Sequence, residues 1–215
     1  MAKVIGIMGE SGSGKTTSMR NLDPKDTFYI DCDKKGLSWK GWKDQYNTEK
    51  KNYIKTDTVD LVRLCLKKLN TEDSMKHFKV CVIDTLNGIM VADEVARMRD
   101  KGYDKWVDLA QCVWELLDGL YSLRDDLTVI VVCHSQTQTE DDGFRWTRIK
   151  TSGKKLDKLN IESKLTTVLH AVVKDGEYVF MTKADNSTCK TPLGAFEEKE
   201  IPNDIVKVLE ALKDY

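Results

Sequence analysis

Residues 9–16 combine three glycines with a lysine and a threonine in the order Gly-Glu-Ser-Gly-Ser-Gly-Lys-Thr. Glycines at this spacing let backbone N–H groups turn inward and form a nest for an anion. The pattern GxxxxGK[ST] is typical of loops that hold the phosphates of a nucleotide, where the lysine reaches the β- and γ-phosphates and the hydroxyl coordinates Mg²⁺. The candidate nucleotide-binding residues are Gly9, Glu10, Ser11, Gly12, Ser13, Gly14, Lys15, Thr16 and Thr17.

A second candidate residue, Asp84, ends the apolar run Val-Cys-Val-Ile at 80–83. A carboxylate at the end of a buried strand beside a phosphate-binding loop can hold Mg²⁺ through water. Apolar residues followed by Asp also begin ordinary turns, which leaves a structural role open. With the loop upstream, we predict that Thr16 and Asp84 organise the magnesium.

The elements that must position these residues follow from the apolar pattern. Continuous apolar runs predict strands at 4–8, 27–31, 79–84 and 127–133. An Asp-Gly turn at 175–176 predicts a hairpin with strands at 168–173 and 178–181. Helices are predicted at 15–21, 58–70, 86–99, 103–124 and 203–213.

Strands that are apolar throughout and alternate with helices indicate a mostly parallel sheet with helices on both faces. The C-terminal hairpin makes the sheet mixed. We therefore predict an α/β fold in one domain, residues 1–215. The glycine loop falls between a predicted strand and a predicted helix, which favours a phosphate-binding loop over a flexible Gly-Ser linker.

Composition narrows the class of protein. The 215 residues carry a net charge of −1, so no global charge excess points to a nucleic-acid or membrane partner. No apolar run approaches the ~20 residues of a membrane span, and the N-terminus leads into a strand and not a signal peptide. Six cysteines lie singly without a CxxC pair, which is typical of reduced cytosolic thiols and speaks against a structural zinc. We expect a cytoplasmic protein.

The stretch at 137–160 is long, polar and basic. A structureless loop of this length is uncommon in a compact domain unless it has a function. Basic residues with an interleaved aromatic suit single-stranded DNA, because phosphates pair with Lys and Arg while bases stack on the ring. A solvated loop and a kinase lid are the alternatives. The candidate DNA-binding residues of this predicted mobile loop are Arg145, Trp146, Arg148, Lys150, Lys154 and Lys155.

From the glycine loop through His134 to the hairpin, the chain resembles the small phage-encoded ATP-binding proteins with a RecA-like core. These are single-domain relatives of recombinases that promote single-strand annealing. The segments Phe-Met-Thr-Lys-Ala at 180–184 and Lys-Thr-Pro-Leu-Gly at 190–194 continue the likeness. The resemblance implies a RecA-like ATPase with ATP and Mg²⁺ as ligands, in the host cytoplasm. It also implies single-stranded DNA as a partner, with a homo-oligomer or a phage recombination protein as further possibilities.

The resemblance also implies roles for residues outside the loop. No Glu follows Asp84, but Asp33 stands where RecA recombinases carry the Glu that activates the attacking water, with a side chain one methylene shorter. His134 is the first choice, and Gln136 the second, for the strand-end residue that senses the γ-phosphate. Lys183 lies near the hairpin, where a basic residue can reach the γ-phosphate held by a neighbouring subunit. The structural alternatives are a solvated turn, a packed histidine and a solvated lysine.

Two other functions remain open. A nucleoside or nucleotide kinase would close a lid over the donor phosphates, with Arg145 and Arg148 as lid residues. A nucleotide-dependent switch would act on a protein partner instead. No base-reading motif such as NKxD occurs, so ATP and GTP are not distinguished.

Overall fold

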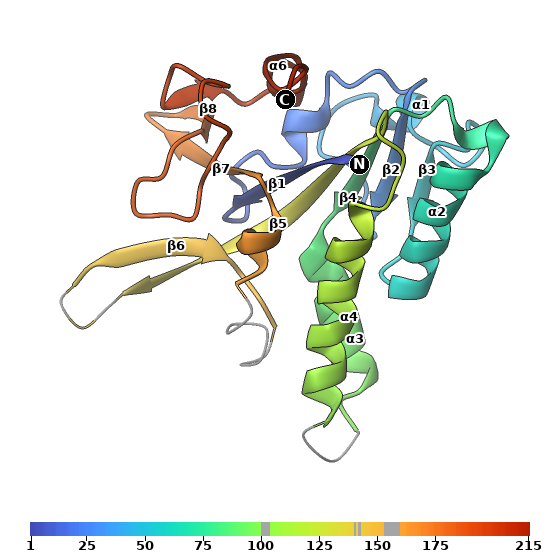
Figure 1. Ribbon diagram of the computed structural model, residues 1–215, viewed down its shortest axis with the longest axis horizontal. Coiled ribbons are helices and arrows are strands. Elements are labelled where there is room, and N and C mark those ends of the chain that lie inside the picture. The colour runs from blue at the N-terminus through green and yellow to red at the C-terminus, as the bar shows by residue number, and fades with distance from the viewer. Residues whose placement is uncertain (100–103, 140, 142, 153–159) are drawn as a thin grey trace.

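The structure, a computed structural model, describes residues 1–99, 104–139, 141, 143–152 and 160–215, with the side chains of 104–106 excepted. A central sheet runs through the molecule in the strand order β3-β2-β4-β5-β1-β7-β8-β9, and β6 pairs with β5 (Figure 1). The strands are β1 (Lys3–Gly9), β2 (Thr27–Asp31), β3 (Tyr53–Lys55), β4 (Val80–Asp84), β5 (Thr128–Thr139), β6 (Arg145–Ile149), β7 (Thr167–Lys174), β8 (Glu177–Met181) and β9 (Glu200–Pro202).

The sheet is mostly parallel. The strands from β3 to β7 in the spatial order run parallel to their neighbours, and β8 and β9 add an antiparallel edge. Asp175 and Gly176 both adopt positive φ angles, which suit the tight turn between β7 and β8. The predicted mixed sheet with a C-terminal hairpin is confirmed.

Helices cover both faces of the sheet. The α-helices are α1 (Trp42–Gln45), α2 (Val59–Thr71), α3 (Leu86–Ala96), α4 (Asp104–Leu120) and α6 (Ile205–Ala211). Single turns of 3-10 helix form η1 (Thr17–Met19), η2 (Asp73–Met75) and η3 (Ile161–Lys164). Among the described residues, no helix has the length and apolar character needed to cross a membrane.

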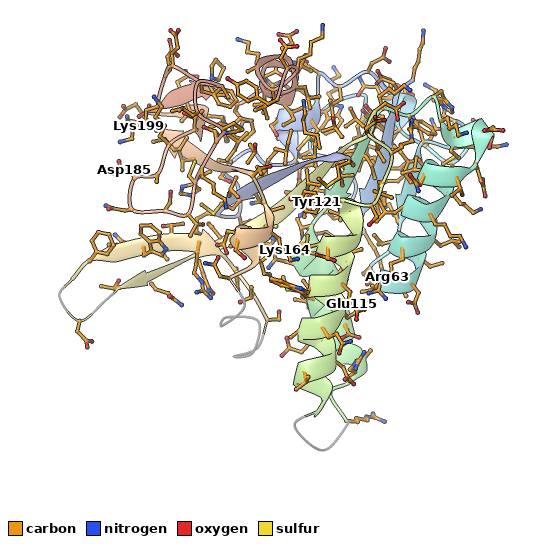
Figure 2. All side chains as sticks on the ribbon, viewed as in Figure 1. Arg63, Glu115, Tyr121, Lys164, Asp185 and Lys199 are labelled. Carbon is orange, nitrogen blue, oxygen red and sulfur yellow. The ribbon has the colours of Figure 1, made fainter. Side chains whose placement is uncertain are left out.

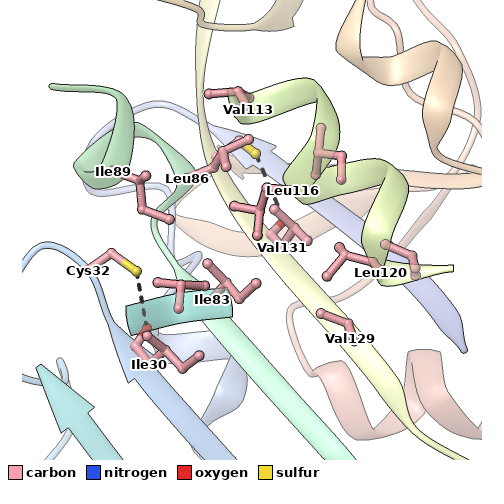
Figure 3. Packing of buried hydrophobic residues seen from close by; sticks show 14 of the residues in the cluster. Ile30, Cys32, Ile83, Leu86, Ile89, Val113, Leu116, Leu120, Val129 and Val131 are labelled. Atoms are coloured by element: carbon pink, nitrogen blue, oxygen red, sulfur yellow. Dashed lines mark hydrogen bonds between the residues drawn. The ribbon is translucent and has the colours of Figure 1, made fainter. Parts of the chain in front are cut away.

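Side chains alternate between two cores along the parallel strands, as the two-residue period of a strand requires. In β1, Val4 and Met8 belong to the core beneath α2, α3 and α4, whereas Ile5 and Ile7 belong to the core that includes η1 and α6. Figure 3 shows the first core, where side chains of β4 and β5 pack against α3 and α4. Burial on both faces explains why these strands are apolar throughout.

Polar contacts fasten the helical layer at its surface (Figure 2). The guanidinium of Arg63 in α2 pairs with the Glu115 carboxylate in α4 at 3.1 Å. The Tyr121 hydroxyl, just beyond α4, donates to the Lys164 carbonyl in η3. Exposed ion pairs of this kind add little stability, so the packing described above is the main source of cohesion.

The helix predicted at 15–21 is reduced to the single turn η1. The Ser18 hydroxyl donates to the Lys15 carbonyl at 2.6 Å, and the Arg20 guanidinium donates to the Thr17 carbonyl at 3.0 Å. These side chains occupy carbonyls that a longer helix would use, and Asp23-Pro24 follows closely. The expectation that a regular helix continues from the phosphate-binding loop was therefore wrong.

Part of the predicted loop at 137–160 is a two-stranded ribbon. β5 continues to Thr139 and pairs antiparallel with β6, and the hydroxyls of Thr137 and Thr147 lie 2.9 Å apart across it. Ile149 anchors β6 because its side chain is buried in the core beneath the helices. Figure 1 shows this β5–β6 ribbon extending beyond the rest of the sheet. Lys154 and Lys155 lie outside the described residues.

Candidate nucleotide-binding site

The sheet brings the predicted site residues to one edge. β5 lies between β1 and β4. The glycine loop follows β1 and Asp84 ends β4, so the two lie on opposite sides of β5 at the same end of the sheet. In register, Gly9 is opposite His134, and Asp31 is opposite Asp84. The carboxyl ends of parallel strands are where α/β proteins bind ligands.

The conformation of the loop depends on its glycines. Gly12 and Gly14 have φ angles of 82° and 87°, in the left-handed region that other residues rarely adopt. A Cβ on Gly14 would lie 2.7 Å from Cδ1 of Tyr178 and 3.2 Å from Oδ1 of Asn203. Gly14 is therefore required by its backbone angle and by the ring packed against it.

Replacing Gly14 by alanine should destabilise the protein by about 1–3 kcal/mol, because the side chain combines backbone strain with a clash. Urea unfolding without nucleotide measures this loss. Gly119→Ala in α4 is a matched control, since a Cβ there meets nothing within 4 Å. That control should gain about 0.5–1 kcal/mol from helix propensity. An equal effect of the two substitutions would contradict this account of the loop.

A cavity of about 280 Å³ lies against the loop. Loop residues line it together with Lys35, Ser38, Thr85, His134 and Tyr178. The Lys15 ammonium donates to the carbonyls of Gly9 at 2.8 Å and Glu10 at 2.6 Å, and only 6% of the residue is exposed. Burial lowers the pKa of Lys15, and the charge of Asp84 partly offsets this. A scarcely hydrated cation is thus held at the loop, where phosphate oxygens would be its natural partners.

Asp84 and Thr16 form the second part of the site. Oδ2 of Asp84 accepts hydrogen bonds from the Thr16 hydroxyl at 2.8 Å and from the Tyr29 hydroxyl at 2.6 Å. Oδ1 of Asp84 is buried and has no hydrogen-bond partner among the described residues. Burial raises the pKa of Asp84, against the hydrogen bonds from Tyr29 and Thr16. An orphaned carboxylate oxygen beside a threonine hydroxyl fits the oxygen ligands that Mg²⁺ requires.

Asp33 lies beside this pair and is already engaged. Its Oδ1 accepts from the Thr85 hydroxyl at 2.8 Å, and its Oδ2 accepts from the Lys35 ammonium at 2.6 Å. Burial alone would raise the pKa of Asp33, but the hydrogen bonds from Lys35 and Thr85 outweigh it and hold the pKa below its usual range. Asp33 is therefore an ionised carboxylate whose two bonding partners line the cavity.

His134 lies at the cavity and is held by its backbone. Its N–H donates to Oδ1 of Asn87 at 2.7 Å, and its carbonyl accepts from the Lys150 N–H at 2.8 Å. Burial, followed by the nearby charge of Lys15, lowers the pKa of His134, so its imidazole is neutral at pH 7. Gln136 lies two residues further along β5, opposite Arg148, and its Nε2 is buried without a partner among the described residues.

Lys183, Arg145 and Trp146 do not line the cavity. Lys183 follows β8, and its ammonium donates to the Glu197 carbonyl at 2.7 Å on the surface. Arg145 is exposed on the β5–β6 ribbon and Trp146 is partly exposed beside it. The structure does not bring Lys183 together with the loop of its own chain.

Four residues that line the cavity were missed by sequence reasoning: Lys35, Ser38, Thr85 and Tyr178. Two had a usable signal, since Lys35 follows Asp33 by two residues and Thr85 follows Asp84 directly. Tyr178 had none, because its place depends on how β8 lies against the loop. Tyr29, which donates to Asp84, was visible only as one apolar residue of a strand.

The glycine loop, its buried lysine and the Thr16–Asp84 pair at the edge of a mostly parallel sheet define a P-loop nucleotide-binding domain. Residues 1–190 match the AAA domain family, and the chain belongs to this family of P-loop ATPase domains. No curated protein matches the chain. Among solved structures, the P4 protein from bacteriophage phi6 in complex with ADP is similar at 14% sequence identity and a TM-score of 0.41, over 84% of this chain and 55% of that one. The chain thus spans about half the length of that protein.

Proposed function

We propose that this chain is an ATPase that couples Mg-ATP binding and hydrolysis to single-stranded DNA binding, in phage-type recombination or strand annealing. The observation that carries the proposal is the continuity of β5. This strand runs without a break from the sheet, past His134 at the nucleotide cavity, to Thr139 on the β5–β6 ribbon. A change at the γ-phosphate could therefore reach the ribbon through one hydrogen-bonded element.

The ribbon has the chemistry that single-stranded DNA requires. The rings of Phe144 and Trp146 are stacked with centroids 6.1 Å apart, beside the exposed Arg145. Such rings can stack on bases of any sequence while the guanidinium pairs with a phosphate. Lys150 would add a further positive charge next to β6, and Lys154 and Lys155, which lie outside the described residues, are proposed as additional DNA contacts.

Hydrolysis would use the residues of the cavity in distinct roles. Backbone N–H groups of the loop and the Lys15 ammonium bind the phosphates, and Thr16 and Asp84 would hold Mg²⁺, which neutralises charge on the phosphate oxygens. Asp33 orients the attacking water, and His134 donates a hydrogen bond to the γ-phosphate as a neutral imidazole. Lys183 is proposed to act on a neighbouring subunit of a homo-oligomer, consistent with its position outside the cavity of its own chain.

The test is to measure ATP hydrolysis with and without single-stranded DNA, and then with a panel of nucleosides and nucleotides. Stimulation by DNA supports the proposal. Phosphoryl transfer to an added nucleoside would replace it with a kinase. Hydrolysis that no DNA stimulates would favour a nucleotide-dependent switch acting on a protein.

Single substitutions on the ribbon should separate phosphate contact from base stacking. Arg145→Ala should make the plot of log affinity against log salt shallower by about 0.7, because one phosphate contact is lost. Trp146→Ala should weaken binding by about tenfold with the salt slope unchanged, because stacking is lost. Fluorescence anisotropy of a labelled oligonucleotide measures both.

Lys68→Ala on α2 is the control for this experiment, since it removes an exposed positive charge from an element away from the ribbon. It should leave DNA affinity and salt slope as they were. If the two ribbon variants behaved like this control, DNA binding by the ribbon would be refuted.

A further inference from the structure

The nucleotide cavity contains a second cation that no sequence motif assigns. Lys35 lines the cavity together with Lys15, and its ammonium lies 2.6 Å from Oδ2 of Asp33. The Lys35 side chain is 59% exposed, whereas that of Asp33 is 15% exposed. The lysine therefore covers the carboxylate on the side that faces solvent.

This ion pair engages Oδ2 of Asp33, an oxygen that the carboxylate would need in order to orient a water. Thr85 donates to one oxygen of Asp33 and Lys35 donates to the other, so both oxygens have partners. Burial alone would lower the pKa of Lys35, but the hydrogen bond to Asp33 and the charges of the nearby carboxylates together outweigh it and raise the pKa, so the lysine keeps its charge. The Thr85 hydroxyl also accepts from the Gly88 N–H at 3.0 Å as the cap of α3, which fixes that side of the carboxylate.

The two contacts differ in how easily they can be exchanged. Thr85 is 1% exposed and held by α3, while Lys35 is a long, largely exposed side chain. The lysine side of this ion pair is exposed, so water screens its charge and can take the place of the contact when the ammonium moves. The γ-phosphate of ATP carries more negative charge than one carboxylate and would attract the ammonium more strongly.

We infer that Lys35 is a catalytic residue that leaves Asp33 for the γ-phosphate of ATP, so that one side chain both neutralises the transferred phosphoryl group and frees the Asp33 oxygen that orients water. This inference rests on the proposed ATP hydrolysis and names a cation supplied by the same chain. It differs from the role proposed for Lys183, which requires a neighbouring subunit.

The hydrolytic step balances with these groups. The water oxygen forms a bond to the γ-phosphorus, and the bond from that phosphorus to the β–γ bridging oxygen breaks, leaving ADP with the electron pair. The water proton passes to Asp33 and then to the released phosphate. Lys35 keeps its proton throughout and returns to Asp33 when phosphate departs.

The experiment compares Lys35→Met with Lys34→Met in the full chain. Lys34 is a matched control, because it is the preceding lysine, has a similarly exposed side chain, pairs with Asp57 at 2.6 Å and does not line the nucleotide cavity. Steady-state hydrolysis gives kcat, and calorimetry gives the affinities for ADP and for ADP with aluminium fluoride, a mimic of the transferring phosphoryl group. Lys35→Arg tests rescue by another cation.

For Lys35→Met, kcat should fall about 100-fold or more, and the affinity for ADP with aluminium fluoride should fall with it. Its affinity for ADP alone should be unchanged, and Lys35→Arg should recover part of both losses. Lys34→Met should match the unmodified protein.

Three results would overturn the inference: unchanged kcat and mimic affinity, an equal loss of ADP affinity, or no recovery with arginine. Failure of the proposed function would look different, because it would appear in the unmodified protein, as no ATP hydrolysis, as phosphoryl transfer to an added nucleoside, or as hydrolysis that DNA does not stimulate. The affinities of the unmodified protein and of Lys35→Met for ADP with aluminium fluoride would still decide whether Lys35 contacts the phosphoryl group.

Discussion

Replacing Lys15 by alanine is expected to abolish nucleotide binding, with an ATP dissociation constant at least about 1,000-fold higher. Lys15 is 6% exposed, and its ammonium lies within 2.8 Å of two loop carbonyls. Its charge is therefore little screened by water. Removing it leaves the phosphates without their nearest cation and the carbonyls without their donor. Calorimetric titration with Mg-ATP measures the loss.

Lys34→Ala controls for the change in net charge, because Lys34 pairs with Asp57 outside the cavity. Thermal unfolding of the two variants without nucleotide shows that each is folded. A folded Lys15→Ala variant that bound ATP as tightly as the control would show that the loop is not the phosphate site.

Asp84→Asn is expected to remove the dependence of ATP binding on magnesium. In the unmodified protein, Mg²⁺ should raise ATP affinity through Thr16 and Asp84. In the variant, affinity with Mg²⁺ should fall to the value measured in EDTA, and hydrolysis should fall by at least about 100-fold. If Mg²⁺ strengthened ATP binding equally in both proteins, Asp84 would not be its ligand.

The same substitution should change how stability depends on pH. Burial raises the pKa of Asp84 above its ordinary value of 3.8, so the folded state retains the proton at a pH where the unfolded state has lost it. The contribution of this group is present below 3.8 and is lost as pH rises through the raised value. In EDTA, the free energy of unfolding of the unmodified protein, relative to that of Asp84→Asn, should therefore fall over the pH range from 3.8 up through the raised pKa. A constant difference across this range would contradict the assignment.

The core of the fold could be predicted because its signals are local. Runs such as residues 80–83 in β4 are apolar at every position, since both faces of the strand are buried, and the glycine loop specifies its own backbone. From these features the mostly parallel sheet follows, with the loop and Asp84 at strand ends. The predicted strand end at His134 was wrong, because pairing with β6 carries β5 on to Thr139.

The parts that could not be predicted depend on partners distant in sequence. The β5–β6 ribbon forms because Ile149 reaches the core beneath the helices, although most residues around it are polar. β3 is only three residues long and is identified by its pairing with β2. Tyr178 reaches the cavity through the placement of β8, and Lys35 through its contact with Asp33. Register and packing decide these contacts, and neither is encoded in a short motif.

The single turn η1 affects how this domain would hold a polyphosphate. A long helix after the loop would present an aligned dipole that needs no rearrangement to meet negative charge. Because η1 spans only three residues, the negative charge of the phosphates would be balanced by the loop N–H groups and by ammonium groups at the ends of flexible side chains. Lys15 is already held by two loop carbonyls, whereas a largely exposed lysine such as Lys35 would give up as much as about 2 kcal/mol of rotamer freedom when an anion fixes it. Nucleotide binding here would thus lose side-chain conformational entropy and gain electrostatic contacts with the phosphates.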